Sequence, residues 1–373
     1  MKTLQCHDAW EQRKLAEVFT YYSDPVDIPH EGYERLGIRS HAKGTFHSYV
    51  PAGHELQTAQ MHRVAANKFI VNITFGWEHA VAVTDENDAG KLVSHRFPQF
   101  SLSEEIDPKF LKFIILDENF RHHLWLASPG GAGRNRVLNL TEMLQYEIQI
   151  PTVVEQKQIA DVLINLDTLI TLHQREGERL QMVKKSMLEN CLPKNGEKVP
   201  RFRFAGFTGD WEQRKLGELV DVCSGMDYKH LSEGNIPVYG TGGYMLSVDE
   251  ALSYDKDAIG IGRKGTIDKP YILKAPFWTV DTLFYCIPKD SDALDFIYDL
   301  FQRVDWKKKD ESTGVPSLSK VAINDTDVKT PSKPEQMRIG TYFKELDHLI
   351  TLHQSELEML KKIKESMLGK MLV

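Results

Sequence analysis

Nearly the same nine-residue segment occurs twice in this 373-residue chain, as LDTLITLHQ from Leu166 and as LDHLITLHQ from Leu346. A second repeated motif lies upstream of each copy: WEQRKLAEVF from Trp10 and WEQRKLGELV from Trp211. The long regions between these motifs share almost no sequence. Internal repeats indicate repeated structural units. We therefore predict two units in which the repeated motifs form a constant frame, and each frame holds a different long region, the insert.

The repeats divide the chain into segments whose lengths suit separate domains with their own cores. Two tails, 151–192 and 331–373, begin at prolines 180 positions apart, and 20 of their first 42 aligned residues are identical. The polar segment PKNGEKVP, residues 193–200, contains proline and glycine, which predicts a linker. The remaining segments, 1–150 and 201–330, are then predicted to be two domains.

Both tails have the pattern of a long helix. Each begins with a capping-box pattern, Thr152 to Glu155 and Ser332 to Glu335. A seam of alternating three- and four-residue spacing follows, which favours packing on another helix. Its positions are Leu163, Leu166, Ile170, His173 and Leu180 in the first tail and Phe343, Leu346, Ile350, His353, Leu357 and Leu360 in the second. A helix of about 38 residues is about 57 Å long, too long for one small domain, so we predict that the two helices pack on each other rather than each on its own core.

The seam histidines, His173 and His353, allow two interpretations: metal ligands, or polar residues that fix the register of the helices. We expect the second, and no metal site is predicted. The four cysteines are widely scattered, with no CxxC pair and no dense framework. This distribution is typical of a reduced, cytoplasmic protein.

The two long regions are predicted to be mixed in structure. Segments such as KFIVNITF and IPVYGTGGYM combine β-branched residues with turn signals, which predicts strands. PKFLKFIILDENFRHHLWLAS and DALDFIYDLFQRVDW have a helical period. The predicted fold class is therefore α+β, with two domains of mixed α/β structure joined by two long helices.

The sequence contains no catalytic constellation. Its GxGxxG pattern begins at Gly260 and is followed by TIDKPY, which does not start the helix that a dinucleotide site requires. No P-loop, HExxH, GxSxG or [DN]PP[YFW] motif occurs. No run of about 18 apolar residues predicts a membrane span. We therefore expect a chain that is not an enzyme by itself, binds no cofactor and has no membrane partner.

Glycine-rich loops with basic residues are the remaining candidate sites. Glycine lets the backbone approach a phosphate closely, and arginine or lysine can reach a phosphate or a guanine edge. We predict DNA contacts from these loops, although ordinary surface turns have similar compositions. The candidates are Arg39, His41, Lys43, Arg134, Asn135 and Arg136 in the first long region and Tyr239, Thr241, Arg263, Lys264, Lys307 and Lys308 in the second.

Three parts of the sequence together resemble the specificity subunit of type I restriction–modification enzymes, over nearly the whole chain. They are RFAGFTGDWEQRKLGEL, the stretch containing IGIGRKGTIDKPYI and PFWTVDTLFY, and the tail EQxxI followed by LDxLITLHQ. In that family two variable target-recognition domains are separated by two conserved helices. The helices pack as an antiparallel coiled coil with a pseudo-twofold axis. The resemblance thus implies that 1–150 and 201–330 are target-recognition domains.

The resemblance also implies a function. A subunit of this kind reads a bipartite DNA target with a fixed spacer, and its partners are double-stranded DNA, two methyltransferase subunits and restriction subunits. S-adenosylmethionine would belong to the methyltransferase subunit, and ATP and Mg²⁺ to the restriction subunit. This chain would direct adenine methylation and restriction without catalytic residues of its own.

Three features of the sequence differ from what the family resemblance predicts. The PRFRFAGF lead before Trp211 is absent before Trp10, and Gly177 stands where the second tail has Leu357. The net charge is −7, with −4 in each long region, which is unusual for a chain that binds a polyanion. The alternative function is that of a coiled-coil adaptor with two β-rich domains for partners other than DNA.

Overall fold

The computed structural model describes residues 10–56, 58, 60–130, 136–194, 196–289 and 293–371. The chain separates into two compact units. Unit 1 comprises Met1–Thr171 with Glu358–Val373, and unit 2 comprises Leu172–Leu357. Both units combine helices and strands, as predicted.

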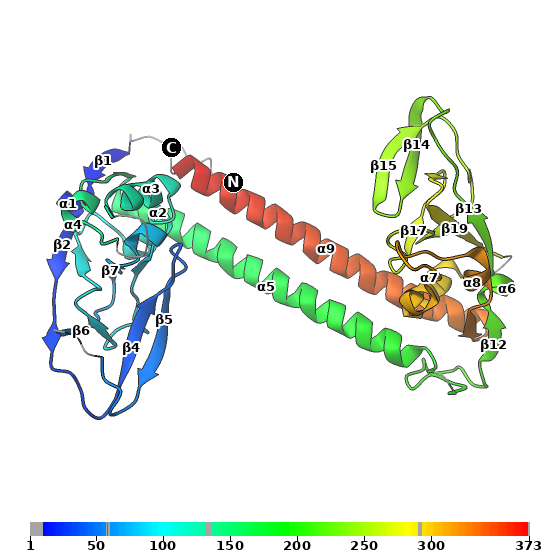
Figure 1. Ribbon diagram of the computed structural model, residues 1–373, viewed down its shortest axis with the longest axis horizontal. Helices are drawn as coiled ribbons and strands as arrows, with labels where there is room; N and C mark the ends of the chain where they lie inside the picture. The colour runs from blue at the N-terminus through cyan, green and yellow to red at the C-terminus, as the bar shows by residue number, and fades with distance from the viewer. Residues whose placement is uncertain are drawn as a thin grey trace. The chain divides into compact units, whose positions relative to one another are not determined.

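Two long helices, α5 (Val153–Cys191) and α9 (Lys333–Met371), confirm the helices predicted for the tails (Figure 1). Each has 39 residues and contributes one part to each unit. All the named seam positions are buried or half-buried. α5 continues through Gly177, where an added Cβ would have no heavy atom within 4 Å. Among the described helices, none is both long and apolar enough to cross a membrane.

The two predicted capping boxes have different outcomes. In the first, the Thr152 hydroxyl accepts a hydrogen bond from the Glu155 amide at 3.4 Å, which is one of the two bonds of a capping box. The second prediction is wrong, because the Glu335 amide donates to the backbone carbonyl of Ser332 at 3.0 Å instead. The Glu335 carboxylate binds Arg203 through two hydrogen bonds of 2.8 Å. A tertiary ion pair has therefore replaced the local cap.

The described residues of unit 1 form three sheets. A four-stranded sheet has the order β2-β10-β7-β8, a five-stranded sheet has the order β3-β6-β9-β4-β5, and β1 pairs with β11. The bounds are β1 (Glu11–Lys14), β2 (Phe19–Tyr22), β3 (Pro25–Val26), β4 (Tyr33–Ile38), β5 (Thr45–Val50), β6 (Met61–Arg63), β7 (Lys68–Val71), β8 (Val81–Val83), β9 (Leu92–Ser94), β10 (Gln99–Leu102) and β11 (Glu147–Ile150). Its short helices are α1 (Leu15–Val18), η1 (Gly76–Glu78), α2 (Pro108–Ile114), α3 (Glu118–Leu126) and α4 (Leu140–Met143).

The single helix expected over 108–128 is two helices, α2 and α3. Asp117 separates them because its carboxylate accepts a hydrogen bond from the Asn119 amide at 3.0 Å and thereby caps α3. Both helices pack on the four-stranded sheet and on the ends of the long helices. This core includes Phe69, Phe100, Phe110, Leu111, Phe120, Leu124, Ala160, Leu163 and Met371.

Unit 2 has a related plan. Its sheets have the orders β13-β19-β16-β17, β15-β14-β18 and β12-β20. The strands are β12 (Glu212–Lys215), β13 (Val220–Ser224), β14 (Glu233–Gly240), β15 (Gly243–Val248), β16 (Ala258–Gly262), β17 (Tyr271–Leu273), β18 (Trp278–Thr279), β19 (Leu283–Pro288) and β20 (Asp327–Thr330). The short helices are α6 (Leu216–Leu219), α7 (Leu294–Arg303), η2 (Trp306–Lys309) and α8 (Lys320–Asn324). The main core joins α7 and β16 to Leu180, Phe343 and Leu346 of the long helices.

The repeated WEQRK motif has the same structural role in both units. In unit 1 it forms β1, which pairs antiparallel with β11, the strand that leads into α5. In unit 2 it forms β12, which pairs antiparallel with β20, the strand that leads into α9. The registers correspond, with Glu11 opposite Ile150 and Glu212 opposite Thr330. Each frame therefore ties the start of its insert to the end of that insert.

A buried carboxyl group in α7 predicts a pH dependence of stability. Asp299 is 1% exposed, and within the described part of the chain its Oδ2 has no hydrogen-bond partner. Burial raises its pKa well above the usual range, and the nearby Lys184 charge opposes that shift. A raised folded-state pKa gives stability that is present below the unfolded pKa of about 3.9 and lost as the pH rises toward the folded value. We expect Asp299→Asn to raise the free energy of unfolding at pH 8 and to change it little at pH 4, measured by urea unfolding. An equal effect at both pH values would contradict this assignment.

Candidate nucleic-acid interface

The first predicted DNA-binding group lies in the turn between β4 and β5. The side chains of Arg39, His41 and Lys43 are all exposed there. The turn closes through a hydrogen bond from the Arg39 amide to the Gly44 carbonyl at 2.9 Å. The Arg39 guanidinium donates to the Thr45 carbonyl and lies 5.3 Å from the centre of the Phe46 ring. The structure thus brings these three candidates together at one tip.

This turn has a strained backbone that its neighbours hold in place. His41 and Ala42 have φ values of 62° and 49°, in the left-handed region that costs such residues free energy. Their amides donate to the carbonyls of Glu78 and His79 at 2.9 and 2.8 Å. The His79 ring is buried against the Ile115 carbonyl, 2.7 Å from Nε2, and burial lowers its pKa. The backbone of this strained turn is thus held by its hydrogen bonds to the Glu78–His79 segment.

The glycine-rich loop of unit 1 contains three further predicted residues. Arg134 and Asn135 lie outside the described residues. Arg136 is half-buried, and its guanidinium lies 4.8 Å from the centre of the exposed Trp125 ring of α3. The cation–π contact holds Arg136 against α3, and its partner on the helix was not among the predicted site residues.

In unit 2, Arg263 and Lys264 follow β16 directly and have exposed side chains. Their amides both donate to the Thr282 carbonyl, at 2.8 and 3.2 Å. The Gly265 amide donates to the Pro316 carbonyl at 2.9 Å, and Gly265 has a φ of 91°. The loop is therefore anchored through its backbone, and the exposed Arg263 guanidinium also donates to the Asp281 carbonyl at 3.4 Å and lies 5.9 Å from the centre of the Phe284 ring.

The GxGxxG pattern has a structural explanation. Gly260 and Gly262 lie within the buried strand β16, and no helix follows them. A Cβ at Gly262 would lie 2.0 Å from the Thr266 carbonyl oxygen, so the chain can fold back there only on a glycine. These glycines therefore serve the packing of the strand and the chain reversal that follows it.

The β14–β15 hairpin brings Thr241 beside the Arg263–Lys264 loop. Thr241 lies at the hairpin tip, and its hydroxyl would be 3.9 Å from a Cβ at Gly265. Tyr239 is half-buried between Tyr244 and Tyr271, with ring centres 6.4 and 6.2 Å away. Thr241 thus lies next to the loop that contains Arg263 and Lys264, whereas the Tyr239 ring packs against neighbouring tyrosine rings and supports the hairpin.

The two lysines predicted in η2 are already engaged with carboxylates. Lys307 lies 2.7 Å from Asp268, and Lys308 lies 3.1 Å from Asp305. The hydrogen bond from Lys307 lowers the pKa of Asp268. The lysine side chains are 74% and 83% exposed, so water screens both pairs and a phosphate could replace either carboxylate.

A hollow beside the hairpin contains residues that the sequence analysis missed. It has a volume of about 700 Å³ and is lined by Tyr228, Lys229, Leu231, Ser232, Glu233, Gly234, Tyr244, Met245, Leu246, Ser247 and Val248. Tyr244 and Met245 are 62% and 49% exposed. Large exposed side chains just after a GTGG turn are a signal that could have identified them, because such residues suit stacking on a flat ligand.

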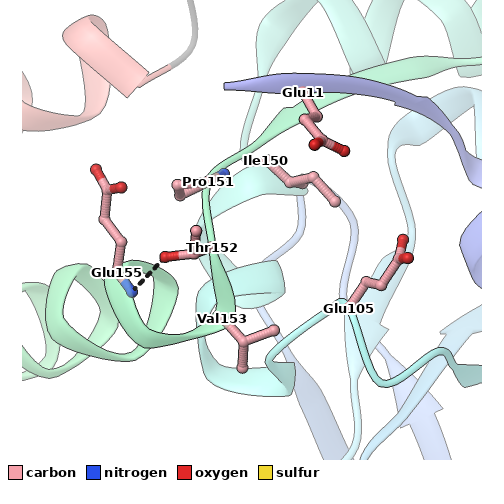
Figure 2. Close-up of a pocket in the computed structure, with 7 residues that line it drawn as sticks. All are labelled: Glu11, Glu105, Ile150, Pro151, Thr152, Val153 and Glu155. Carbon is pink, nitrogen blue, oxygen red and sulfur yellow. Dashed lines mark hydrogen bonds between the residues drawn. The ribbon is translucent and has the colours of Figure 1, made fainter. Parts of the chain in front are cut away.

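A second hollow, at the start of α5, does not suit a nucleic acid. Figure 2 shows its lining, in which the side chains of Glu11, Glu105 and Glu155 surround the Pro151–Val153 turn. Its volume is about 450 Å³. Arg13 lies 2.6 Å from Glu11 and 3.5 Å from Glu105 and neutralises part of this charge. Three carboxylates around one opening repel a phosphate backbone.

Comparisons with known proteins agree with this architecture. The model of the family described as the type I restriction modification DNA specificity domain matches the chain twice, over residues 7–182 and 208–362. A solved specificity (S) subunit of a type I restriction–modification system from M. genitalium has a TM-score of 0.64 at 18% identity, covering 99% of this chain and 97% of that one. The HsdS subunit from Thermoanaerobacter tengcongensis has a TM-score of 0.51 at 15% identity, covering 100% and 98%. These structures share the fold of this chain.

Two curated relatives come from Methanocaldococcus jannaschii. The type I restriction enzyme MjaVIII specificity subunit is 24% identical over 268 residues, which are 61% of this chain and 61% of the relative. The putative type I restriction enzyme MjaX specificity subunit is 23% identical over 295 residues, 72% of this chain and 68% of the relative. This chain thus spans somewhat less than two thirds of the first relative. Since the family model covers most of both halves, the chain belongs to the type I restriction modification DNA specificity domain family.

Proposed function

We propose that this chain is the DNA sequence-specificity subunit of a type I restriction–modification complex. One observation carries the proposal: two units share a frame and hold unlike inserts, and each insert has a basic turn fixed by its backbone. Two different inserts on one frame suit a target with two different halves. Residues 1–150 and 201–330 are the proposed target-recognition domains, 151–192 and 331–373 the conserved helices, and 193–200 the linker.

The two conserved helices form an antiparallel coiled coil with a pseudo-twofold axis in this proposal. Two ion pairs support it: Lys184 lies 2.5 Å from Asp347 in unit 2, and Lys364 lies 2.5 Å from Asp167 in unit 1. Lys184 and Lys364 are 180 positions apart, and so are Asp167 and Asp347, so the two pairs are equivalent with the helices exchanged. The repeated aspartate of LDxLITLHQ and the repeated lysine of KxSML are therefore partners across the helix pair.

The partners in this proposal are double-stranded DNA, two methyltransferase subunits and restriction subunits, in the cytoplasm. The methyltransferase subunit would carry S-adenosylmethionine, and the restriction subunit would carry ATP and Mg²⁺. The net charge of −7 fits a chain whose partners supply most of the phosphate neutralisation. The free chain should then bind DNA weakly, with a shallow salt dependence.

The proposed function can be tested by co-expression with the methyltransferase subunit of the same system in a host without DNA methylation. Genome-wide mapping of N6-methyladenine should give one split motif, with defined bases on each side of a fixed unspecified gap. A continuous motif would contradict two separate readers. Neither a stable complex nor methylation would favour the adaptor function instead.

The loop that contains Arg263 and Lys264 in unit 2 leads to a prediction about DNA sequence specificity. Replacing Arg263 and Lys264 together with alanine should relax one half of the motif and leave the other half intact. A lost bidentate base contact costs about 1–3 kcal/mol of discrimination, which mapped methylation would detect as degenerate positions. Lys256→Ala, at another exposed lysine of unit 2, is the control and should leave the motif unchanged. Loss of complex assembly in the double variant would mean that the loop is structural.

A further inference from the structure

The repeated motif LITLHQxE places a histidine and a glutamate three residues apart in each long helix, His173 with Glu176 and His353 with Glu356. Residues at this spacing are neighbours on one helix face. Within unit 2 the two helices run in opposite directions, because Lys184 contacts Asp347 while His173 contacts His353. The motif of one helix therefore faces the motif of the other.

The facing side chains converge on one point. The Nδ1 atoms of His173 and His353 are 3.1 Å apart. The Oε2 atom of Glu356 lies 3.3 Å from Nδ1 of His173 and 3.9 Å from Nδ1 of His353. All three ligand atoms lie within 4.8 Å of one another. Bonds of about 2.0–2.2 Å to a tetrahedral zinc ion separate its ligand atoms by about 3.3–3.6 Å, so the observed triangle is close to the size that such an ion requires.

We propose that His173, His353 and Glu356 bind a Zn²⁺ ion between α5 and α9. Two imidazoles and one carboxylate suit zinc, whereas Mg²⁺ and Ca²⁺ prefer oxygen ligands throughout. The side chains are 23%, 24% and 40% exposed, so water can complete the fourth position. Helical bundles also build metal sites from inward-facing side chains of neighbouring helices, including glutamate and histidine three residues apart.

Glu176, the glutamate of the repeated motif in α5, is not a proposed ligand because another side chain already binds it. Glu176 is held by Arg179 through hydrogen bonds of 2.8 and 2.6 Å, and this contact lowers the pKa of Glu176. The position of the second helix that corresponds to Arg179 is Met359, which cannot engage Glu356 in the same way. Among the described residues, the ion pairs of Glu356 are those with the two histidines.

A bound ion would fix the register of the two helices at this level. The three ligands come from both helices, and the unfolded chain does not hold them together, so zinc would stabilise the folded state by mass action. The register function expected for the histidines from the sequence is thus retained, with the ion as the link. This inference is independent of the proposed DNA function.

The test is a Zn²⁺ titration of the full-length, chelator-treated chain against a chromogenic competitor. We expect one tight site per chain and, with Co²⁺ as a probe, the visible absorption of a tetrahedral ion. His353→Leu and Glu356→Gln should each weaken binding by at least the roughly 10- to 100-fold that loss of a group supporting a ligand costs. Leucine suits a seam position, so circular dichroism of His353→Leu should show an unchanged helix content.

Two matched controls separate this site from adventitious binding. His348 is an exposed histidine of α9, and Glu176 is the counterpart of Glu356 in α5. His348→Leu and Glu176→Gln should leave the zinc affinity and the Co²⁺ spectrum unchanged. The proposal is overturned if the native chain has no stoichiometric Zn²⁺ site, or if His348→Leu weakens binding as much as His353→Leu. An equal loss in Glu176→Gln and Glu356→Gln would overturn the assignment of Glu356 as the third ligand.

Discussion

Replacing Arg203 with alanine should lower the free energy of unfolding of unit 2 by about 3–5 kcal/mol, the usual cost of breaking a buried ion pair from one side. Arg203 binds both carboxylate oxygens of Glu335, whose side chain is 1% exposed. It also donates to the carbonyls of Thr208 and Gly209 at 3.1 and 2.7 Å. The alanine variant leaves a charged carboxylate buried without a partner at the start of α9. Urea unfolding, with hydrogen exchange of the α7 amides to report on unit 2, would measure the loss.

Arg201 provides the matched control for this prediction. It lies two residues earlier, is 57% exposed and contacts Glu197 at 3.3 Å. An exposed pair of this kind contributes about 0–1 kcal/mol, so Arg201→Ala should change stability little. The double variant Arg203→Ala with Glu335→Gln should recover part of the loss, because no buried charge remains. Equal losses of stability in Arg201→Ala and Arg203→Ala would contradict the prediction. They would mean that the ion pair between Arg203 and Glu335 makes no specific contribution.

Inserting one heptad into each long helix should lengthen the unspecified gap of the DNA target by about three base pairs and leave both half-sites unchanged. Seven helical residues add about 10.5 Å, and one base pair rises about 3.4 Å. A whole heptad keeps the seam in phase. Suitable positions follow Thr171 in α5 and Leu357 in α9, where the two units divide. Mapping of N6-methyladenine in the co-expression host would give the new gap directly.

The same seven residues placed after Gly53 serve as the control. Gly53 is exposed in the turn after β5, and an added Cβ there would meet nothing within 4 Å. This insertion should leave the gap unchanged, since it does not lengthen the helices. An unchanged gap in the heptad variant, with a stable complex, would contradict the idea that the helices set the spacing of the target.

Much of the fold could be predicted from sequence, because its signals are periodic or repeated. The heptad rhythm gave both long helices, and the repeated motifs gave the two-unit plan that the structure contains. The errors arose where a polar side chain could form hydrogen bonds with more than one partner. Asp117 caps a new helix within the stretch predicted as one. Glu335 leaves the predicted capping box to bind Arg203, which is 132 positions earlier in the chain.

The candidate DNA-binding residues were harder to predict from the sequence than the fold. Composition identified basic residues near glycines, and the structure places Arg39, Arg263 and Lys264 on exposed turns. Composition could not distinguish these from Lys307, whose charge is paired with Asp268. It also missed the exposed Tyr244 of the β14–β15 hairpin. Whether a charge is free or paired depends on which strands and loops become neighbours, and local sequence does not contain that information.

The duplicated motifs, the two long helices and the two unlike inserts are readable from the amino-acid sequence, because repetition and helical period are properties of the chain alone. The contacts of the repeated polar residues depend instead on how the folded chain brings the two helices together. Lys184 reaches Asp347, and His173 meets His353, across helices separated by more than a hundred residues of chain. These contacts arise because the helices run in opposite directions within unit 2, and that direction is set by the path of the insert between them.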